Sequence, residues 1–306
     1  MSRPKEPRRP APPPGLLIVD KPAGMTSHDV VARARRIMGT RKVGHAGTLD
    51  PMATGVLVLG IERATKLLGH LALDRKTYLA TLSLGRSTTT DDAEGEPLSG
   101  TDAAPETLAA VADEQIAGGI AALTGDIQQV PSAVSAVKID GKRAYARVRA
   151  GEDVVLPPRP VTVHRFDVLG LRREDDRIEL DAIVECSSGT YVRALARDLG
   201  AGLGVGGHLK ALRRTTVGPF TLARARTLDQ LEEKPELSLD LDAAVAAAFP
   251  RRDLDAATAK AVQYGRRIPA AGITGTYGLF APDGHVLALA SDAEGVTRSV
   301  VVLLPA

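Results

Sequence analysis

Short strand-like segments separated by single helical segments constrain the fold of this chain more than any other feature. Residues 77–84 alternate in polarity, and residues 177–186 do so again, which is typical of half-buried β-strands. Thr26 and Asp29 form a helix-start signal, Val30 and Ala34 then recur at helical spacing, and Gly39 is a stop signal. Because strands and helices do not follow a regular βαβ order, we expect an α+β fold with a mixed, mainly antiparallel sheet flanked by helices.

The N-terminal segment does not look like a targeting signal. Residues 1–14 combine prolines with basic side chains and lack the apolar core of a secretory signal. This composition predicts a disordered basic tail, which is either merely solvated or an arm that touches nucleic acid. No apolar segment approaches the ~18 residues that a membrane helix requires. We therefore expect a cytoplasmic protein that does not bind a membrane.

Changes in composition divide the rest of the chain into domains. We expect a main domain at residues 15–232, with a basic insertion at about residues 131–160, because strand and helix patterns run through these positions. Clustered acids and Pro235 mark residues 233–249 as a linker. Residues 250–306 contain a Pro-Asp-Gly hairpin signal between apolar runs, which predicts a separate small β domain.

Charged residues are segregated along the chain, although the net charge is only +2. Basic side chains concentrate in residues 30–44, 138–149 and 210–226. Residues 91–114 hold eight acids and no base, which predicts a solvated loop followed by a helix at residues 105–117, facing away from any polyanion. The basic clusters suggest a face that binds a polyanion. The alternative is a set of cations scattered over a solvated surface.

The segment Gly44–Pro51 is the strongest local signal for chemistry. Its glycines allow a tight turn or a close approach to a ligand. Asp50 precedes Pro51, which favours extended backbone at Asp50. A carboxylate held on such a loop can act as a nucleophile or a general base. An aspartate that only bonds its own turn is an equally simple interpretation at this point.

A second signal, Ser188–Arg193, joins a strand to the start of a helix. Arg193 could bind a carboxylate and Tyr191 could offer its ring to a base, but an ordinary helix start with a surface arginine fits as well. Tyr78 alternates with apolar neighbours and could be an ordinary core tyrosine. Cys186 also alternates with apolar residues, and we expect it to be buried in a strand.

Several cofactor classes are not expected. The single cysteine excludes an internal disulfide and any zinc site that needs two thiolates. The six histidines show no metal-ligand spacing. Residues 202–207 match a dinucleotide-binding GxGxxG string, but they follow a helical segment rather than a strand, so the required context is missing. We expect neither a metal nor a cofactor.

The motifs, taken in order, resemble those of the bacterial tRNA pseudouridine synthase B (TruB) family. The resemblance rests on six segments, at residues 20–27, 44–55, 75–78, 131–145, 186–193 and 212–218. Val134 stands where the family pattern has tyrosine. The resemblance implies a pseudouridine synthase fold with a C-terminal domain similar to the PUA RNA-binding fold.

The resemblance also implies the reaction and the partner. A uridine in the T loop of tRNA, at nucleotide position 55, is isomerised to pseudouridine. The N1–C1′ bond breaks, the base turns, and a C5–C1′ bond forms, with no cofactor. The substrate is the T stem-loop of tRNA, and we expect a monomer that needs no protein partner.

Roles carry over to individual residues only through this resemblance. Asp50 corresponds to the catalytic carboxylate, Arg193 to its charge-stabilising partner, and Tyr78 to the ring that stacks on the target base. The remaining substrate-binding positions are Tyr191 and Leu212 in the pocket, His45 in the space that the flipped base vacates, Gly47 and Thr48 in the Asp50 motif, and Lys21 and Lys66 in scaffolding and RNA contact.

Two other functions remain open on the sequence. An RNA-binding or RNA-folding protein with little or no catalysis would need only the basic clusters and the C-terminal domain. A guide-RNA-dependent relative of the family would carry a longer basic extension and depend on partner proteins, and we expect neither here.

Overall fold

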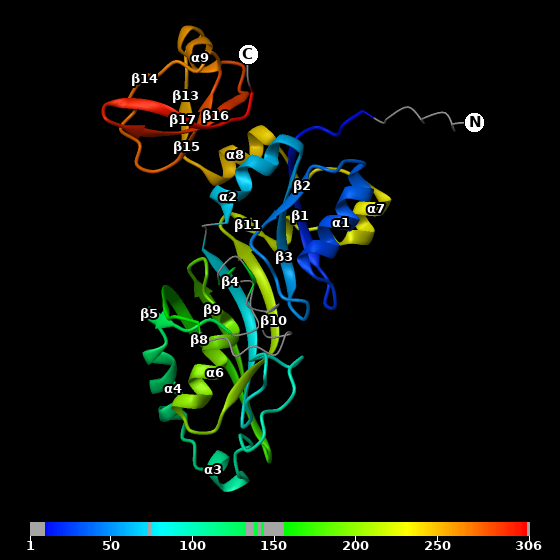
Figure 1. The fold of residues 1–306 in the computed structure, drawn as a ribbon, viewed down its shortest axis with the longest axis vertical. Helices are drawn as coiled ribbons and strands as arrows, with labels where there is room; N and C mark the ends of the chain where they lie inside the picture. Colours follow the sequence, from blue (N-terminus) through cyan, green and yellow to red (C-terminus); the bar gives the residue numbers. More distant parts are fainter. Residues whose placement is uncertain (1–9, 73–74, 133–137, 140–141, 144–155, 305–306) are drawn as a thin grey trace, which may run out of the picture. The chain divides into compact units, whose positions relative to one another are not determined.

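The computed structural model describes residues 10–72, 75–132, 138–139, 142–143 and 156–304 (Figure 1). The chain divides into two compact units. The first unit comprises Met1–Pro51, Gly55–Ala72 and Val217–Ala306, and the second comprises Met52–Thr54 and Leu73–Thr216. No helix in the described part of the chain is long and apolar enough to cross a membrane.

The N-terminal sheet of the first unit is built on two buried strands. Strand β1 (Gly15–Lys21) pairs antiparallel with β3 (Thr54–Ile61) along its whole length. Strand β12 (Leu239–Asp240) pairs with the other edge of β1, and β2 (Val43–Ala46) pairs with β3. The continuous apolar run Leu16–Val19 is fully buried, as expected for a central strand.

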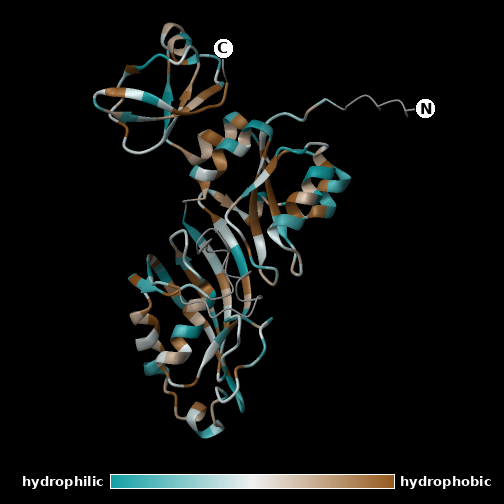
Figure 2. Cartoon of the chain, viewed as in Figure 1, coloured by the Kyte–Doolittle hydropathy of each residue, from teal (hydrophilic) through white to brown (hydrophobic). Residues whose placement is uncertain are grey.

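Helix α1 (Ser27–Met38) begins and ends where the sequence predicts. Thr26 and Asp29 form a reciprocal capping box, and Gly39 ends the helix at a φ of 66°, in the left-handed region. Figure 2 shows both hydrophobic and hydrophilic residues on α1 and on α7 (Leu228–Glu233). The Arg33 guanidinium ties the two helices together through Asp229 and Glu232, each at 2.7 Å.

The last part of the first unit is the small β domain that the sequence predicts. Its five strands follow the order β13-β15-β16-β17-β14. Their bounds are β13 (Arg251–Asp253), β14 (Ile268–Pro269), β15 (Tyr277–Phe280), β16 (Val286–Ala293) and β17 (Val296–Val302). Helix α9 (Ala256–Gln263) packs on this sheet, and α8 (Leu241–Ala248) precedes it. Gly284, at a φ of 88°, lies in the predicted hairpin turn between β15 and β16.

A polar cluster around the Asp292 carboxylate fixes the loop between β14 and β15. The Asp292 carboxylate accepts hydrogen bonds from the Tyr277 hydroxyl and from the backbone amides of Ala271, Gly272 and Ile273. The Tyr277 hydrogen bond, together with those from the backbone, lowers the pKa of Asp292 to about 2. The small domain therefore has a polar anchor as well as an apolar core.

The second unit contains an antiparallel sheet in the order β10-β4-β9-β8-β5. Its strands are β4 (Lys76–Leu84), β5 (Gly125–Gln129), β8 (Arg159–Glu174), β9 (Arg177–Cys186) and β10 (Gly207–Val217). Helix α6 (Val192–Gly202) packs against β4, and α4 (Asp113–Ala122) packs against α6. Together with the first unit, these elements confirm the predicted α+β fold with a mainly antiparallel sheet and a small C-terminal β domain.

The GxGxxG string, residues 202–207, lies where α6 leads into β10 and lacks the context of a dinucleotide site. A side chain at Gly207, its last glycine, would meet the Ala196 carbonyl at 2.5 Å, and one at Gly200, just before the string, would meet backbone atoms of Gly206 at 2.2 and 2.3 Å. Glycine is needed where the end of α6 turns closely into β10. The string follows a helix, as the sequence predicts, and it leads into β10.

The single helix predicted at residues 105–117 is wrong. The chain forms α3 (Pro105–Ala109) and then α4, which begins at Asp113. Ala112 is extended between them, and the Gln115 side chain caps its amide at 2.8 Å, while Val111 is buried. Within the basic insertion, the structure describes only β6 (Lys138–Ile139) and β7 (Lys142–Arg143) between residues 133 and 155, so Val134 lies outside the described residues.

Candidate active site

Asp50 lies on the loop that leads from β2 to β3, as the sequence predicts. The loop turns at Gly47, whose φ of 81° is in the left-handed region that a glycine adopts readily. Asp50 is half-buried, so its carboxylate is neither sealed in the core nor fully solvated, while Thr48 is exposed. An acidic side chain in this setting remains open to a substrate.

The backbone on both sides of Asp50 is held by buried side chains. The Ser27 hydroxyl donates to the Leu49 carbonyl at 3.1 Å and accepts from the Leu49 amide at 2.9 Å. The Lys21 ammonium donates to the Pro51 carbonyl at 3.1 Å, and the Gly24 amide donates to the same oxygen at 2.9 Å. These contacts fix the position of the loop before any substrate binds.

Lys21 is a positioning residue in this arrangement. Its side chain is fully buried, and its ammonium also donates to the carbonyls of Pro22 at 2.9 Å and Met25 at 2.6 Å. An ammonium has three protons, and the three carbonyl oxygens of Pro22, Met25 and Pro51 accept hydrogen bonds from it. These contacts hold the backbone of the loop, and the scaffolding role that the resemblance implies for Lys21 stays a prediction.

Lys21→Met should therefore destabilise the protein and disorder the Asp50 loop. The variant leaves buried carbonyls without their donor, which we expect to lower the free energy of unfolding by about 3 kcal/mol. Urea unfolding of the variant measures this loss. Lys234→Met is the matched control, since the Lys234 side chain is largely exposed and its ammonium pairs with Glu236 at 3.0 Å, so its loss should cost less than about 1 kcal/mol. Equal effects at the two positions would contradict the role of Lys21.

His45 and Lys66, also in the first unit, lie in different surroundings. His45 is half-buried on β2, opposite Leu59, and its ring meets the His28 ring edge-on with centroids 5.5 Å apart. Lys66 lies in the short 3-10 helix η1 (Glu62–Leu67), and its ammonium donates to the Val302 carbonyl at 2.9 Å. Lys66 thus contacts the small β domain.

Tyr78 lies on β4 in the second unit. It is only 7% exposed and stands opposite Val184 of β9. Leu212 is also buried, on β10. Leu212 borders a cavity of about 560 Å³, whose other lining residues include Leu79, Ala80 and Arg213.

The start of α6 is held by a side chain that the sequence interpretation missed. The Gln129 amide donates to the Tyr191 carbonyl at 3.1 Å, and its oxygen accepts from the Tyr191 amide at 2.8 Å. Gln129 is 2% exposed at the end of β5. The clamp fixes Tyr191, which is half-buried immediately before the first residue of α6.

Arg193 is buried, so the alternative of a surface arginine is wrong. It is 4% exposed, and its guanidinium donates to the Thr90 carbonyl at 2.8 Å and to the Asp92 carboxylate at 3.2 Å. Asp92 is 3% exposed and also accepts from the Thr90 hydroxyl at 2.5 Å and from the Glu94 amide at 3.1 Å. Several contacts therefore orient the guanidinium.

The prediction that residues 91–114 form a solvated acidic segment is wrong at its start. Asp92 pairs with Arg193, and Asp91 pairs with Arg197 at 2.9 Å, one turn further along α6. Asp92 supplies the counter-charge for the buried Arg193, because a buried guanidinium without one is costly. The pairing expected between Arg193 and Asp50 joins residues of the two separate units and stays a prediction.

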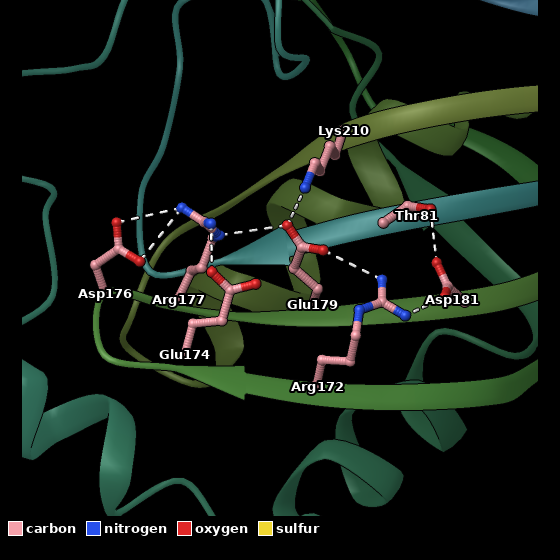
Figure 3. Close-up of polar contacts among 8 residues, drawn as sticks. All are labelled: Thr81, Arg172, Glu174, Asp176, Arg177, Glu179, Asp181 and Lys210. Carbon is pink, nitrogen blue, oxygen red and sulfur yellow. Dashed lines mark hydrogen bonds and ion pairs between the residues drawn. The ribbon is translucent and has the colours of Figure 1, made fainter.

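Many cations of the predicted basic clusters have partners within the protein. On the face of the second unit shown in Figure 3, Lys210 contacts Glu179, and Arg172 contacts Glu179 and Asp181. The Lys210 and Arg172 hydrogen bonds lower the pKa of Glu179. Lys210 is therefore part of a network of ion pairs within the protein, with Glu179, Arg172 and Asp181. Arg33 is likewise paired with Asp229 and Glu232 of α7.

Cys186 is buried on β9, as expected, with a relative exposure of 1%. Burial raises the pKa of its thiol to about 11, which disfavours the reactive thiolate. Among the described residues, no group of three or more His, Cys, Asp or Glu side chains is arranged to hold a metal ion.

Comparison with known proteins places these features in a family. Residues 35–192 match the model of the TruB family pseudouridylate synthase N-terminal domain. Residues 193–245 match a tRNA pseudouridylate synthase B C-terminal domain, and residues 249–304 match a tRNA pseudouridine synthase II C-terminal domain.

Full-length relatives and solved structures agree with these matches. The chain is 61% identical to the tRNA pseudouridine synthase B of Rhodococcus jostii, covering 95% of this chain and 94% of that protein. It is 61% identical to the protein of that name from Nocardia farcinica, with the same coverage. The fold matches a chain in the crystal structure of a Cbf5-Nop10-Gar1 complex with a TM-score of 0.70 and 25% identity, covering 95% of this chain and 85% of that one. The chain therefore belongs to the TruB family of pseudouridylate synthases.

Proposed function

We propose that this chain isomerises uridine to pseudouridine in tRNA, and that its target is the T-loop uridine at nucleotide position 55. The observation that carries this proposal is the half-buried Asp50, held by Ser27 and Lys21 on its two sides, in a chain of this family. A carboxylate carried on a backbone that is fixed in this way can meet one atom of a bound nucleotide repeatedly.

The reaction balances without an oxidant or another reactant. The N1–C1′ bond of the uridine breaks, the free base turns, and its C5 forms a new bond to C1′. The proton on C5 leaves, and N1 gains a proton, so the product is an isomer. Asp50 supplies the carboxylate that assists this exchange, as a nucleophile or as a base.

The target base has to leave the T loop before it can react. Extrusion of a base costs a few kcal/mol of stacking and pairing free energy, and contacts in the pocket must offset this cost. Stacking on the Tyr78 ring supplies ~1–3 kcal/mol. Tyr191 and Leu212 line the pocket, and His45 fills the vacated space, while Gly47 and Thr48 bring the loop backbone close to the RNA.

Arg193 orients and charge-stabilises Asp50 in this proposal. A planar guanidinium can bind carboxylates on two edges, which suits it to join Asp92 and Asp50. Asp92 and the Thr90 carbonyl hold one edge. Asp92 is thereby a positioning residue.

The remaining assignments follow from the same family. We propose a catalytic domain at residues 15–232 and a PUA-like RNA-binding domain at residues 250–306, joined by a linker. The protein acts in the cytoplasm as a monomer and needs no protein partner. The substrate part that it recognises is the T stem-loop, and its exposed cations, including Lys66, contact phosphates, so affinity falls steeply with salt.

Release of tritium tests the proposed reaction. Unmodified tRNA labelled with tritium at uridine C5 should lose label to water when the purified protein is added, because the C5 proton is replaced by the bond to C1′. The control is the same labelled tRNA with cytidine in place of the T-loop uridine, and it should release no label above background. Absence of release from the wild-type tRNA would overturn the enzymatic function.

A further inference from the structure

An exposed aromatic ring stands at the end of helix α9 in the small β domain. Tyr264 is 66% exposed, the largest exposure among the large hydrophobic side chains of the described residues. The chain contains only nine aromatic residues. A single exposed ring is not by itself a binding site, but an aromatic ring with a free face can stack on a nucleic-acid base.

The backbone around this tyrosine is well fixed. The Tyr264 amide donates to the Lys260 carbonyl at 3.2 Å, and the Arg266 amide donates to the Ala261 carbonyl at 2.9 Å. Gly265, at a φ of 71°, makes the turn between them. Ala259 and Val262 anchor the opposite face of the helix in the domain core. The ring is thus presented by a rigid helix end rather than by a loose loop.

Cations without acidic partners surround the ring. Lys260, Arg266 and Arg267 are all exposed, and within the described residues none of them forms an ion pair. Two other arginines of the same domain do have acidic partners, since Arg251 pairs with Asp253 and Arg298 with Glu294. Unpaired positive charge beside the ring favours an anionic ligand.

A hollow joins the ring to two of these cations. It has a volume of about 350 Å³ and is lined by Ala257, Lys260, Ala261, Tyr264 and Arg266. The alanines leave the space open beside the ring, and none of the lining residues is acidic. The volume lies in the range in which proteins hold small ligands.

We propose that this hollow, formed around Tyr264, Lys260 and Arg266, binds an unpaired nucleotide of the tRNA substrate. The base stacks on the Tyr264 ring, and the two cations contact the flanking phosphates. A ring combined with cations is the arrangement that holds single-stranded nucleic acid, whereas a paired base presents no free face to a side chain. The identity of the RNA rests on the function proposed above, but the site lies outside the reacting residues.

Equilibrium binding of full-length tRNA transcript to the intact protein tests the site. Tyr264→Ala should weaken binding by about 10-fold, because stacking on one base is lost. Tyr264→Phe should bind as the wild type does, since it keeps the ring. Unchanged affinity in Tyr264→Ala, or equal losses in both variants, would overturn the proposal. Because Tyr264 is exposed, the fold should survive either change, which circular dichroism checks.

The cations are tested by the dependence of binding on salt. Lys260→Ala combined with Arg266→Ala should reduce the slope of log affinity against log salt by about 1–2. Arg298→Ala is the matched control, since Arg298 is already paired with Glu294, and it should leave the slope unchanged. An equal slope change in the control would overturn the proposal.

Tritium release separates this site from the reaction itself. At saturating tRNA, Tyr264→Ala should release label at the wild-type rate, because the reacting residues are intact. If the wild type releases label but Tyr264→Ala binds tRNA with unchanged affinity, the proposed nucleotide-binding site is overturned and the proposed reaction is not. Lack of release by the wild type would overturn the proposed function and leave the binding result to decide the site.

Discussion

Asp50→Asn is expected to lower the single-turnover rate of tritium release from C5-labelled tRNA by at least about 10³-fold. The amide keeps the shape of the side chain but is neither a good nucleophile nor a base. Lys21 and Ser27 hold the loop backbone, so the loop should stay in place. The measurement is label release with enzyme in excess over tRNA.

Binding of tRNA should survive the same substitution, within about threefold of the wild-type dissociation constant. Asp283→Asn makes the same chemical change in the exposed hairpin turn between β15 and β16, and it should leave the rate unaltered. A variant at Asp50 that retains a tenth or more of the wild-type rate would refute the catalytic role. A wild-type protein that binds tRNA but releases no label would instead favour an RNA-binding function.

Arg193→Lys should reduce the rate of label release by about 100-fold. Lysine keeps the charge but has no planar fork, so it cannot hold the Thr90 carbonyl and the Asp92 carboxylate while also reaching a further carboxylate. A displacement of about 1 Å at a reacting group costs on the order of 10² in rate. Single-turnover kinetics with saturating enzyme separate this loss from any loss of binding.

Arg197→Lys is the control for this substitution on the same helix. Arg197 also pairs with an aspartate, Asp91, and donates to the Val130 carbonyl at 2.8 Å, but it has no proposed contact with substrate. Its rate should stay within about threefold of the wild type. Similar losses at both arginines would show that stability of α6, and not the geometry at Arg193, sets the rate.

The sequence was sufficient for features that depend on local patterns. The helix that begins at Thr26 and ends at Gly39 was predictable because capping side chains and a C-terminal glycine act on adjacent backbone. The burial of Cys186 followed from period-two alternation along β9. The Asp50 motif was found because its glycines and proline constrain the backbone wherever they occur.

Contacts between distant segments were not predictable in the same way. Asp92 lies in a segment of eight acids, and nothing in its local sequence shows that one of them is buried against Arg193, about a hundred residues further along the chain. The run Thr88–Thr90 before it was a usable hint, since hydroxyl side chains often bond nearby carboxylates and backbone in turns. Gln129 gave no such hint, because its partner is the backbone at Tyr191.

The charge clusters show why counting cations along a sequence is not enough. Lys210 belongs to a basic cluster in the sequence, yet the fold pairs its ammonium with the Glu179 carboxylate of β9. Lys260 and Arg266 stand in a segment that did not stand out, yet neither has an acidic partner among the residues that the structure describes. The free charge of a surface depends on the three-dimensional pairing, which only the structure supplies.

A crystal structure of the protein with a T-arm RNA, in which the position-55 nucleotide is a non-reacting analogue, tests the central role of Asp50 most directly. We predict that this one nucleotide is turned out of its loop, with its base on the Tyr78 ring and its sugar or base within about 3.5 Å of an Asp50 oxygen. A nucleotide that stays stacked in the loop, or that is bound with Asp50 beyond the reach of every reacting atom, would contradict the assignment.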